Sequence, residues 1–379
     1  MKLIYVVNQR LPIEKAYGLQ IAKMAEAFAG LGLEVELVAP RRKDPIKKSI
    51  FEYFGVKKNF KVTTVSSLDF YLPGKLDILA VNFKSFLSAI QLFLFSVSKK
   101  HDLIYSRDEL PLYFLSFFKK NLVFEAHRFS EKRKFFYRRF KNMSLKTVVI
   151  SKGLGNEFLR FGFKPQNVLV AHDGVDLEEF DVNLNKDQAR LKLGLPEKRK
   201  LVGYVGQLRT LGMEKGIDLA IKSLKSLPDD VNLVLVGGDK KGLDLYKELS
   251  AKEGLKDRVL FAGQIKHDLI PLYLKSFDVL LMPFPDIKHY AFYMSPLKLF
   301  EYMASKRPIV ATDLPSVREI LNEKNSVLVQ PESPESLADG VKLLLGDQNL
   351  AESLANQAFQ DVKDHTWQKR AEKILEFVK

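Results

Sequence analysis

The stretch from Ser295 to Thr312 holds the most chemistry, because a lysine, Lys298, is followed one turn later by a carboxylate, Glu301. Ser295 is a good N-cap and Pro296 suits the first helical position, so the sequence predicts a helix that begins here. Backbone amides at the start of a helix, together with the helix dipole, favour a diphosphate. An ionised glutamate only accepts hydrogen bonds, so Glu301 could take two hydroxyl donors from a ribose. A capped core helix with a solvated glutamate is the structural alternative.

A second group of charges lies on the loop that follows a predicted strand at residues 200–206. Gly206 ends this strand, and Arg209 and Lys215 lie on the glycine-containing loop before the next helix. Two fixed cations beside helix N-termini could neutralise a diphosphate as it leaves. Two solvated cations on a loop are the alternative, but their occurrence together with the glycines favours phosphate binding.

Two residues of the first half follow predicted strands. His127 ends the apolar run 122–127, and the carboxyl end of a strand in an α/β domain points into a binding cleft. A neutral imidazole there could hydrogen-bond a sugar hydroxyl or a leaving phosphate. Gly18 precedes a helix that we expect from about Leu19, and it would let a phosphate or sugar approach the backbone. A core histidine and a plain loop glycine are the alternatives.

Strand-like runs alternate with helical ones along the whole chain, which predicts parallel sheets covered by helices. The first half has such runs at 2–8, 34–40, 60–66, 103–107, 122–127, 147–151 and 168–172. The second half has them at 200–206, 232–237, 259–263, 279–283, 308–312 and 326–329. Two such series predict an α/β chain of two doubly wound, Rossmann-like domains with a cleft between them. We expect the domains at 1–172 and 173–362, with a last helix, 363–379, that returns to the first domain.

Length and composition agree with a globular chain of two domains. The 379 residues suffice for two cores, and the absence of cysteine excludes a disulfide framework and a thiolate metal site. The N-terminal apolar run is too short for a signal peptide and predicts a strand. The longest apolar run, 83–97, contains polar residues and falls short of a membrane span. We expect 83–100 to be a buried helix, and 111–120 to be buried as well.

The net charge of +14 is unevenly distributed, with +16 on residues 1–172 and −2 on residues 173–379. The first half therefore faces an anionic partner: acidic lipid, a phosphorylated acceptor or nucleic acid. Its densest segment, 128–141, has seven basic residues, five aromatic residues and one acidic residue. Basic residues interleaved with aromatics predict an interfacial helix on anionic lipid. The predicted surface consists of Lys132, Arg133, Lys134, Arg138, Arg139 and Lys141, with Phe135, Phe136, Tyr137 and Phe140 as apolar anchors.

The segment Ser-Pro-Leu-Lys-Leu-Phe-Glu-Tyr at 295–302 resembles the donor-site segment of retaining glycosyltransferases of the GT-B fold, in glycosyltransferase family 4. Phe-Glu-Ala-His at 124–127 and the Arg…Glu-Lys-Gly pattern that ends at Gly216 resemble the same family. That family usually has two glutamates eight positions apart. Glu301 matches the second, whereas Tyr293 stands where the first would be.

The resemblance implies transfer of a sugar from a UDP- or GDP-sugar, with retention, to a glycan or a lipid-linked acceptor, as in polysaccharide biosynthesis. It implies that the backbone at Gln264 and Ile265 meets the nucleobase. The catalytic set is then His127, Arg209 and Lys215. The donor-binding set is Gly18, Gly206, Gln264, Ile265, Ser295, Pro296, Leu297, Lys298 and Glu301.

No Asp-x-Asp triplet occurs in the sequence, so we expect no metal or other cofactor, and the cations and the helix at Ser295 would hold the diphosphate. No carboxylate that could serve as a nucleophile is evident, which favours front-face departure and attack. We expect a cytoplasmic protein that binds peripherally at the inner face of the cell membrane.

Two other classes of protein remain open. A sugar-nucleotide epimerase of the same fold would need a pair of acid and base carboxylates, which we cannot place. A basic nucleic-acid-binding protein would explain the charge of the first half and the aromatic residues within it. It would not explain the phosphate-binding loop and Glu301 together, and no RNA-binding or helix-turn-helix signature is present, so we expect no nucleic-acid partner.

Overall fold

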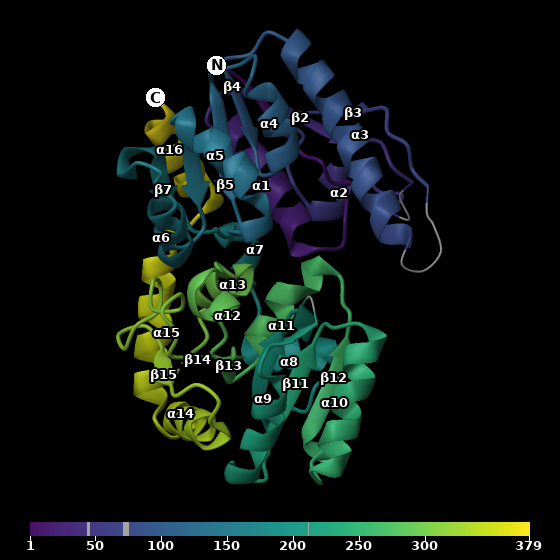
Figure 1. The fold of residues 1–379 in the computed structure, drawn as a ribbon. Coiled ribbons are helices and arrows are strands. Elements are labelled where there is room, and N and C mark those ends of the chain that lie inside the picture. Colours follow the sequence, from purple (N-terminus) through teal and green to yellow (C-terminus); the bar gives the residue numbers. More distant parts are fainter. Residues whose placement is uncertain (44–45, 71–75, 211) are drawn as a thin grey trace. The chain divides into compact units, whose positions relative to one another are not determined.

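The computed structural model describes residues 1–43, 46–70, 76–210 and 212–379 (Figure 1). The chain divides into two compact units, one of Met1–His172 with Trp367–Lys379 and one of Asp173–Thr366. The last helix, α16 (Trp367–Val378), therefore belongs to the first unit, and it begins at Trp367 rather than at residue 363.

The first unit is built on a seven-stranded sheet in the order β3-β2-β1-β4-β5-β6-β7. All neighbouring strands are parallel, and the order reverses between β1 and β4, as in a doubly wound fold. Its strands are β1 (Lys2–Val6), β2 (Glu34–Pro40), β3 (Lys61–Val65), β4 (Leu103–Ser106), β5 (Leu122–Ala126), β6 (Lys146–Val149) and β7 (Val168–Val170). Each falls within or beside a run predicted from the sequence.

Helices connect these strands. They are α1 (Ala16–Gly30), α2 (Ile50–Phe54), α3 (Leu76–Ser98), α4 (Glu109–Leu115), α5 (Lys134–Asn142) and α6 (Lys152–Arg160). Local capping explains several of their starts: Ser49 and Glu52 form a capping box on α2, and the Ser151 side chain caps α6. Helix α16 packs against α1.

Helix α3 departs from the sequence prediction of a buried helix. By length and composition alone, Asp77–Ser98 is apolar enough to cross a membrane, and only 28% of its most apolar window is buried. The helix nevertheless packs along α4 and the strands β1, β2 and β3 of the first unit. Large apolar side chains such as Phe83 and Phe86 are exposed on it, so the prediction of burial is wrong for this face. Phe117 and Phe118, in the other segment expected to be buried, are exposed as well.

The second unit has a six-stranded parallel sheet in the order β12-β11-β8-β13-β14-β15. Its strands are β8 (Lys200–Val205), β11 (Val231–Val236), β12 (Val259–Gly263), β13 (Val279–Met282), β14 (Ile309–Thr312) and β15 (Val327–Val329). Two parallel Rossmann-like sheets confirm the predicted α/β architecture. A short antiparallel hairpin, β9 (Arg209–Thr210) with β10 (Met213–Glu214), was not predicted.

The helices of the second unit connect and cover the strands of its sheet (Figure 1). They are α7 (Leu177–Phe180), α8 (Lys186–Leu193), α9 (Ile217–Ser223), α10 (Lys240–Lys252), α11 (Ile270–Ser276), α12 (Lys288–Phe292), α13 (Leu297–Ala304), α14 (Pro334–Gly346) and α15 (Gln348–Val362). The Asp176 side chain caps α7 and the Asp239 side chain caps α10.

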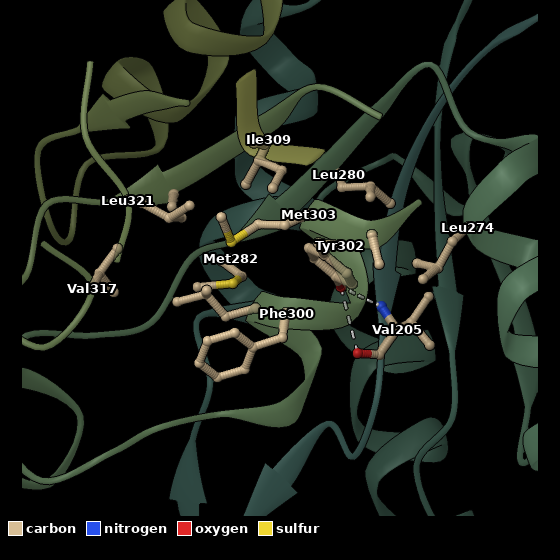
Figure 2. Close-up of a cluster of buried hydrophobic side chains, with 14 of the residues drawn as sticks. Val205, Leu274, Leu280, Met282, Phe300, Tyr302, Met303, Ile309, Val317 and Leu321 are labelled. Carbon is tan, nitrogen blue, oxygen red and sulfur yellow. Dashed lines mark hydrogen bonds between the residues drawn. The ribbon is translucent and has the colours of Figure 1, made fainter. Parts of the chain in front are cut away.

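Helix α13 is fixed to the sheet through its buried face (Figure 2). The Tyr302 hydroxyl accepts a hydrogen bond from the backbone amide of Val205, at the end of β8, over 2.8 Å. Each large apolar side chain that is fully buried in the core around α13 contributes about 1.5–3 kcal/mol to the free energy of folding. This packing leaves Leu297 and Glu301 on the half-buried side of the helix. The surrounding core includes Leu274, Leu280, Met282, Phe300, Met303, Ile309, Val317 and Leu321.

Candidate active site

The start of α13 differs in detail from the prediction. Pro296, rather than Ser295, is the N-cap, and no side chain caps the helix. The Ser295 hydroxyl instead accepts a hydrogen bond from the backbone amide of Asp173 over 2.9 Å, which joins the start of the second unit to this helix. The predicted cap at Ser295 is therefore wrong. The first amides of α13 remain available to an anion, as expected for an uncapped helix start.

The Lys298 ammonium is buried near the end of β8 and has no hydrogen-bond partner within the described chain. Its Nζ lies 3.5 Å from the centre of the Tyr204 ring and 5.6 Å from that of Phe284. Burial lowers the pKa of Lys298 well below its usual range, Lys215 lowers it further and Glu301 raises it. A buried cation that rests only on ring faces is costly until an anion joins it. The surroundings of Lys298 are therefore ones that an anion would stabilise.

Gly206 makes room for this ammonium. The residue follows β8 with φ at 131°, and a Cβ atom built there would lie 2.9 Å from Lys298 Nζ. Any larger residue at position 206 would push the lysine away, besides straining the backbone. Gly206 therefore lies against Lys298, and its contact with the donor stays a prediction.

Lys215 lies beside the same site. It precedes Gly216, which begins α9 with φ at 75°, and a Cβ atom at 216 would lie 1.6 Å from the carbonyl oxygen of Pro283. Only glycine lets the loop come so close to the end of β13. Burial lowers the pKa of the Lys215 ammonium to about 8. Burial lowers the pKa values of Lys298 and of His289, on α12, and the charge of Lys215 lowers both further, so Lys215 lies within electrostatic range of each.

Arg209 is held on the unpredicted hairpin. Its Nε forms an ion pair with Glu214 over 2.9 Å, and its Nη2 donates to the carbonyl oxygen of Gly212 over 3.0 Å. Glu214 also accepts a hydrogen bond from the hydroxyl of Tyr246. The structure thus brings Lys215 together with Lys298 and gives Arg209 a carboxylate partner of its own.

Glu301 lies one turn along α13 from the lysine. Burial raises the pKa of its carboxyl, whereas His267 and Lys298 lower it and Glu179 raises it. Among the described residues, its carboxylate makes no hydrogen bond or ion pair, so its acceptor capacity is open to a ligand. His267 pairs with Glu179 over 2.9 Å, and Lys266 is the N-cap of the short 3-10 helix that follows.

The residues expected at the nucleobase follow β12. Gln264 is exposed, and Ile265 is half-buried against the core beneath α13.

Tyr293 stands where the family's first glutamate would be, and it ends α12 within reach of Lys288, whose Nζ lies 5.4 Å from its ring centre. His289, on the same helix, was missed by the sequence analysis. It lies in no recognisable motif, and only the fold places it beside Lys215.

In the first unit, His127 follows β5 and is anchored by a buried carboxylate. Its Nε2 lies 2.9 Å from Oε1 of Glu125, which also accepts from Gln20 over 2.7 Å and from Arg370 of α16 over 2.6 Å. Arg107 holds the other end of Gln20 over 2.7 Å. Burial lowers the pKa of His127 to about 4, so the imidazole is neutral at pH 7.

Gly18 lies elsewhere than expected. The helix starts at Ala16, not near Leu19, so Gly18 lies in its first turn. A Cβ atom at this position would lie 2.7 Å from Ile13 and 2.8 Å from Phe54, so side chains fill the space that a ligand would need. The structure thus gives Gly18 a packing function, and its donor contact stays a prediction.

The predicted basic surface is only partly free. Arg133 donates to Glu109 over 2.7 Å, and Arg139 donates to the carbonyl oxygen of Ser116 over 2.8 Å, so both hold α5 against α4. Lys134 pairs with Glu131, whereas Lys132 and Arg138 are exposed. Of the aromatics, Phe135 is exposed and Phe136 half-buried, but Tyr137 and Phe140 are fully buried. The prediction of Tyr137 and Phe140 as membrane anchors is therefore wrong.

Comparison with known proteins covers nearly the whole chain. Residues 18–179 match the family model described as glycosyltransferase family 4, and residues 185–361 match that described as glycosyl transferases group 1. An uncharacterised glycosyltransferase of Methanocaldococcus jannaschii is 28% identical over 245 residues, which cover 62% of this chain and 60% of the relative. The lipopolysaccharide core biosynthesis mannosyltransferase LpsB of Rhizobium meliloti is 29% identical over 221 residues, covering 55% and 59%. The chain thus spans no more than 60% of the length of these two curated relatives.

Solved structures share the fold over its full length. HepE from Anabaena, crystallised with UDP, has a TM-score of 0.75 at 18% identity and covers 99% of both chains. Sucrose-phosphate synthase from Thermosynechococcus elongatus has a TM-score of 0.75 at 20% identity, covering 99% of this chain and 97% of its own. At such identities the likeness establishes the fold and leaves the chemistry to the residues.

Proposed function

The chain belongs to the group 1 and family 4 glycosyltransferases of the GT-B fold, and on that premise we propose that it moves a sugar, with retention, from a nucleotide diphosphate sugar to a glycan or lipid-linked acceptor. The observation that carries the proposal is the buried, unpaired ammonium of Lys298 beside Lys215 at the carboxyl end of the parallel sheet. Two like charges held together in a partly desolvated site favour an anion strongly. The diphosphate of the donor provides that anion.

The diphosphate sits at the start of α13 in this proposal. The amides of Leu297 and Lys298 and the helix dipole face its oxygens, and the ammonium groups of Lys215 and Lys298 neutralise its charge. Arg209 lies on the hairpin that precedes Lys215. Arg209 contacts the diphosphate by giving up part of its ion pair with Glu214. These groups stabilise charge as it develops on the departing phosphate oxygen.

Glu301 binds the ribose of the donor in the same proposal. Its carboxylate lies one turn along the helix from the diphosphate cations, with acceptor capacity to spare. The two ribose hydroxyls donate to its two oxygens. UDP in the crystal structure of HepE makes uridine the first nucleoside to test here, with GDP-sugars second. Gln264 and Ile265 then present their backbone to the base.

His127 contacts the sugar. Burial raises the pKa of Glu125, but Arg370 and the hydrogen bond from His127 outweigh it and hold that pKa well below the usual range. Glu125 is therefore ionised, and the single proton of the neutral imidazole lies on Nε2. Nδ1 is then an acceptor, and it makes no hydrogen bond within the described chain. It accepts a hydrogen bond from a sugar hydroxyl. Glu125 and Arg370 act as positioning residues, because they fix the tautomer and the orientation of the ring.

The transfer needs no covalent intermediate on the protein. The bond from the anomeric carbon to the diphosphate breaks as the acceptor oxygen approaches from the same face, and the acceptor proton moves to the leaving phosphate oxygen. Positioning and charge stabilisation then supply most of the rate. Among the described residues, no group of three or more His, Asp or Glu side chains is arranged to hold a metal ion. We propose that Lys215, Lys298 and Arg209 carry the diphosphate charge.

The acceptor of the proposed transfer carries negative charge or lies beside it. The basic first half suits an acceptor that carries phosphate or lies in an anionic membrane, at its cytoplasmic face. The related LpsB is named for lipopolysaccharide core biosynthesis, which agrees with such an acceptor.

The experiment starts with donor binding and proceeds to product. A thermal-shift screen with UDP-, GDP- and other nucleotide sugars identifies the donor, because a ligand of the folded state raises its stability. NMR of the product then gives the anomeric configuration, and inversion would overturn retention. Lys215→Ala and Arg209→Ala should lose turnover while free nucleoside binds nearly as before. Incubation with donor alone tests the alternative, because an epimerase would form a new sugar nucleotide without acceptor.

A further inference from the structure

Helix α3 buries small and polar side chains and exposes large apolar ones, the reverse of the usual arrangement in a surface helix. Its inner face, at four-residue spacing, carries Ala80, Lys84, Ser88, Leu92 and Ser96, all of them buried. The outer side of the helix carries the large apolar residues, and their exposed fractions lie between 45% and 65%. We call this outer side the α3 apolar face; it consists of Ile78, Leu79, Val81, Phe83, Phe86 and Leu94.

The inner face is fixed by polar contacts, so the helix cannot roll to bury its apolar side. Lys84 forms an ion pair with Asp69 over 3.7 Å, and Ser88 accepts a hydrogen bond from Arg42 over 3.2 Å. The side chain of Asn8 donates to the backbone carbonyl of Ser85 over 2.9 Å. Rotation would break all three contacts and leave a lysine unpaired, so these contacts oppose it. The exposure of the apolar side of α3 is therefore part of the folded structure of the first unit.

The apolar surface continues beyond α3. Phe86 and Phe93 pack on Phe114 of α4, with ring centres 6.0 and 6.2 Å apart, and Phe93 also packs on Phe118 at 5.3 Å. From α4, Tyr113 connects to Phe135 of α5 at 4.9 Å. Exposed aromatics from the turn after α4 and from α5 thus join the α3 apolar face in one surface. They are Phe117, Phe118 and Phe135.

Cations border this surface. Lys99 and Lys100 follow the end of α3, and Lys119 and Lys120 follow the exposed phenylalanines after α4. The guanidinium of Arg139 lies 4.3 Å from the ring centre of Phe117. Two copies of the chain that paired through this surface would bring these cations together, which like-charge repulsion disfavours. Anionic lipid instead offers hydrocarbon to the rings and phosphate to the lysines.

We propose that the α3 apolar face, with Phe117, Phe118 and Phe135, inserts into the interface of an anionic bilayer and holds the first unit on the membrane. The helix lies in the membrane plane and does not cross the bilayer, because its inner face stays on the sheet. The membrane contact itself does not depend on the proposed function. Only the inference that the acceptor lies at the membrane rests on it. It also moves the membrane contact from the α5 cluster, where the sequence put it, to α3.

Vesicle co-sedimentation tests the proposal with the whole chain. The wild type should bind phosphatidylcholine vesicles that contain phosphatidylglycerol, and bind pure phosphatidylcholine much less. Replacing Ile78, Leu79 and Phe83 together by glutamine, a good helix former, should lower the partition coefficient about tenfold or more. The matched control replaces three exposed leucines of the second unit by glutamine and should bind like the wild type; these are Leu191, Leu245 and Leu343.

A spectroscopic readout separates insertion from adsorption. The chain's single tryptophan, Trp367, is buried, so a Phe83→Trp variant adds one exposed reporter. Its emission should shift to the blue on anionic vesicles and be quenched by lipids brominated along the acyl chain. Binding without shift or quenching, or a glutamine variant that binds like the wild type, would overturn the proposal. So would a wild type that ignores anionic vesicles and dimerises through α3 in ultracentrifugation.

UDP affinity of the same variants is the internal control. It should stay at the wild-type value, because none of the substituted residues lies in the donor site. A protein that binds vesicles as expected but transfers no sugar would count against the proposed function and leave the membrane surface standing.

Discussion

The ionisation of Lys215 should govern how diphosphate affinity depends on pH. Burial lowers the pKa of its ammonium to about 8 in the free protein, from the ordinary 10.5. A bound diphosphate favours the charged form, so the pKa rises in the complex. The complex therefore keeps a proton that the free protein loses above about pH 8, and affinity for UDP is full below that pH and falls above it. Between about pH 7 and pH 9 the loss is about tenfold, or ~1.4 kcal/mol.

Calorimetric titration with UDP at constant ionic strength measures this effect. Lys215→Arg is the matched control, because a guanidinium stays charged throughout the range. Lys298 and the nucleotide itself also titrate, so the informative quantity is the difference between the wild-type and Lys215→Arg profiles. The wild type should lose about tenfold more affinity than the variant, and heats in two buffers should show proton uptake above about pH 8. Parallel profiles without proton uptake would refute the placement of Lys215 at the diphosphate.

Other residues make further predictions. Glu301→Gln should weaken UDP-sugar binding about tenfold or more in calorimetry, because a hydrogen bond to a charged group contributes about 1.5–3 kcal/mol, and unchanged affinity would remove Glu301 from the site. His127→Ala should lower turnover far more than the denaturation midpoint, whereas the reverse would make His127 a core residue. Stability should be full above the unfolded pKa of His127, near 6.5, and fall as pH drops towards its folded pKa of about 4. The loss is up to about 3 kcal/mol in denaturant unfolding and absent from His127→Gln, and a pH-independent wild type would contradict it. EDTA should leave turnover intact, and its full loss would bring a metal into the mechanism.

The sheets could be predicted from the sequence because buried parallel strands are short, continuous apolar runs. Every strand of the two large sheets falls in or beside a predicted run. The β9–β10 hairpin could not be predicted in this way. Its strands have two residues each, and it is held by the Arg209–Glu214 ion pair and by the packing of one apolar side chain, Met213, on the core.

The site was predictable in its residues but not in its contacts. Lys298 and Lys215 are far apart in sequence, and only the crossing of α13 over the end of β8 puts the lysine against Gly206. The Ser295 cap failed for a similar reason. Its hydroxyl found a tertiary partner in the amide of Asp173, which local propensity does not register.

Helix α3 was misread from its average composition. An apolar helix is normally buried, but which side is buried depends on where its small and polar residues lie. Ala80, Lys84, Ser88 and Ser96 recur every four or eight positions, a stripe that could have identified the inner face. The partners of that stripe, Asp69 and Arg42, come from other elements, so only the folded unit explains why it faces inward.

The order of synthesis has a consequence for His127. Glu125 is fully buried, and Arg370, which donates to it over 2.6 Å, lies on α16. When residues 1–172 have left the ribosome, that carboxylate still lacks Arg370, and the surface of α1 that receives α16 is uncovered. The first unit therefore completes its fold only when α16 has been synthesised. A truncation that removes α16 thus acts on a histidine in the first half of the chain.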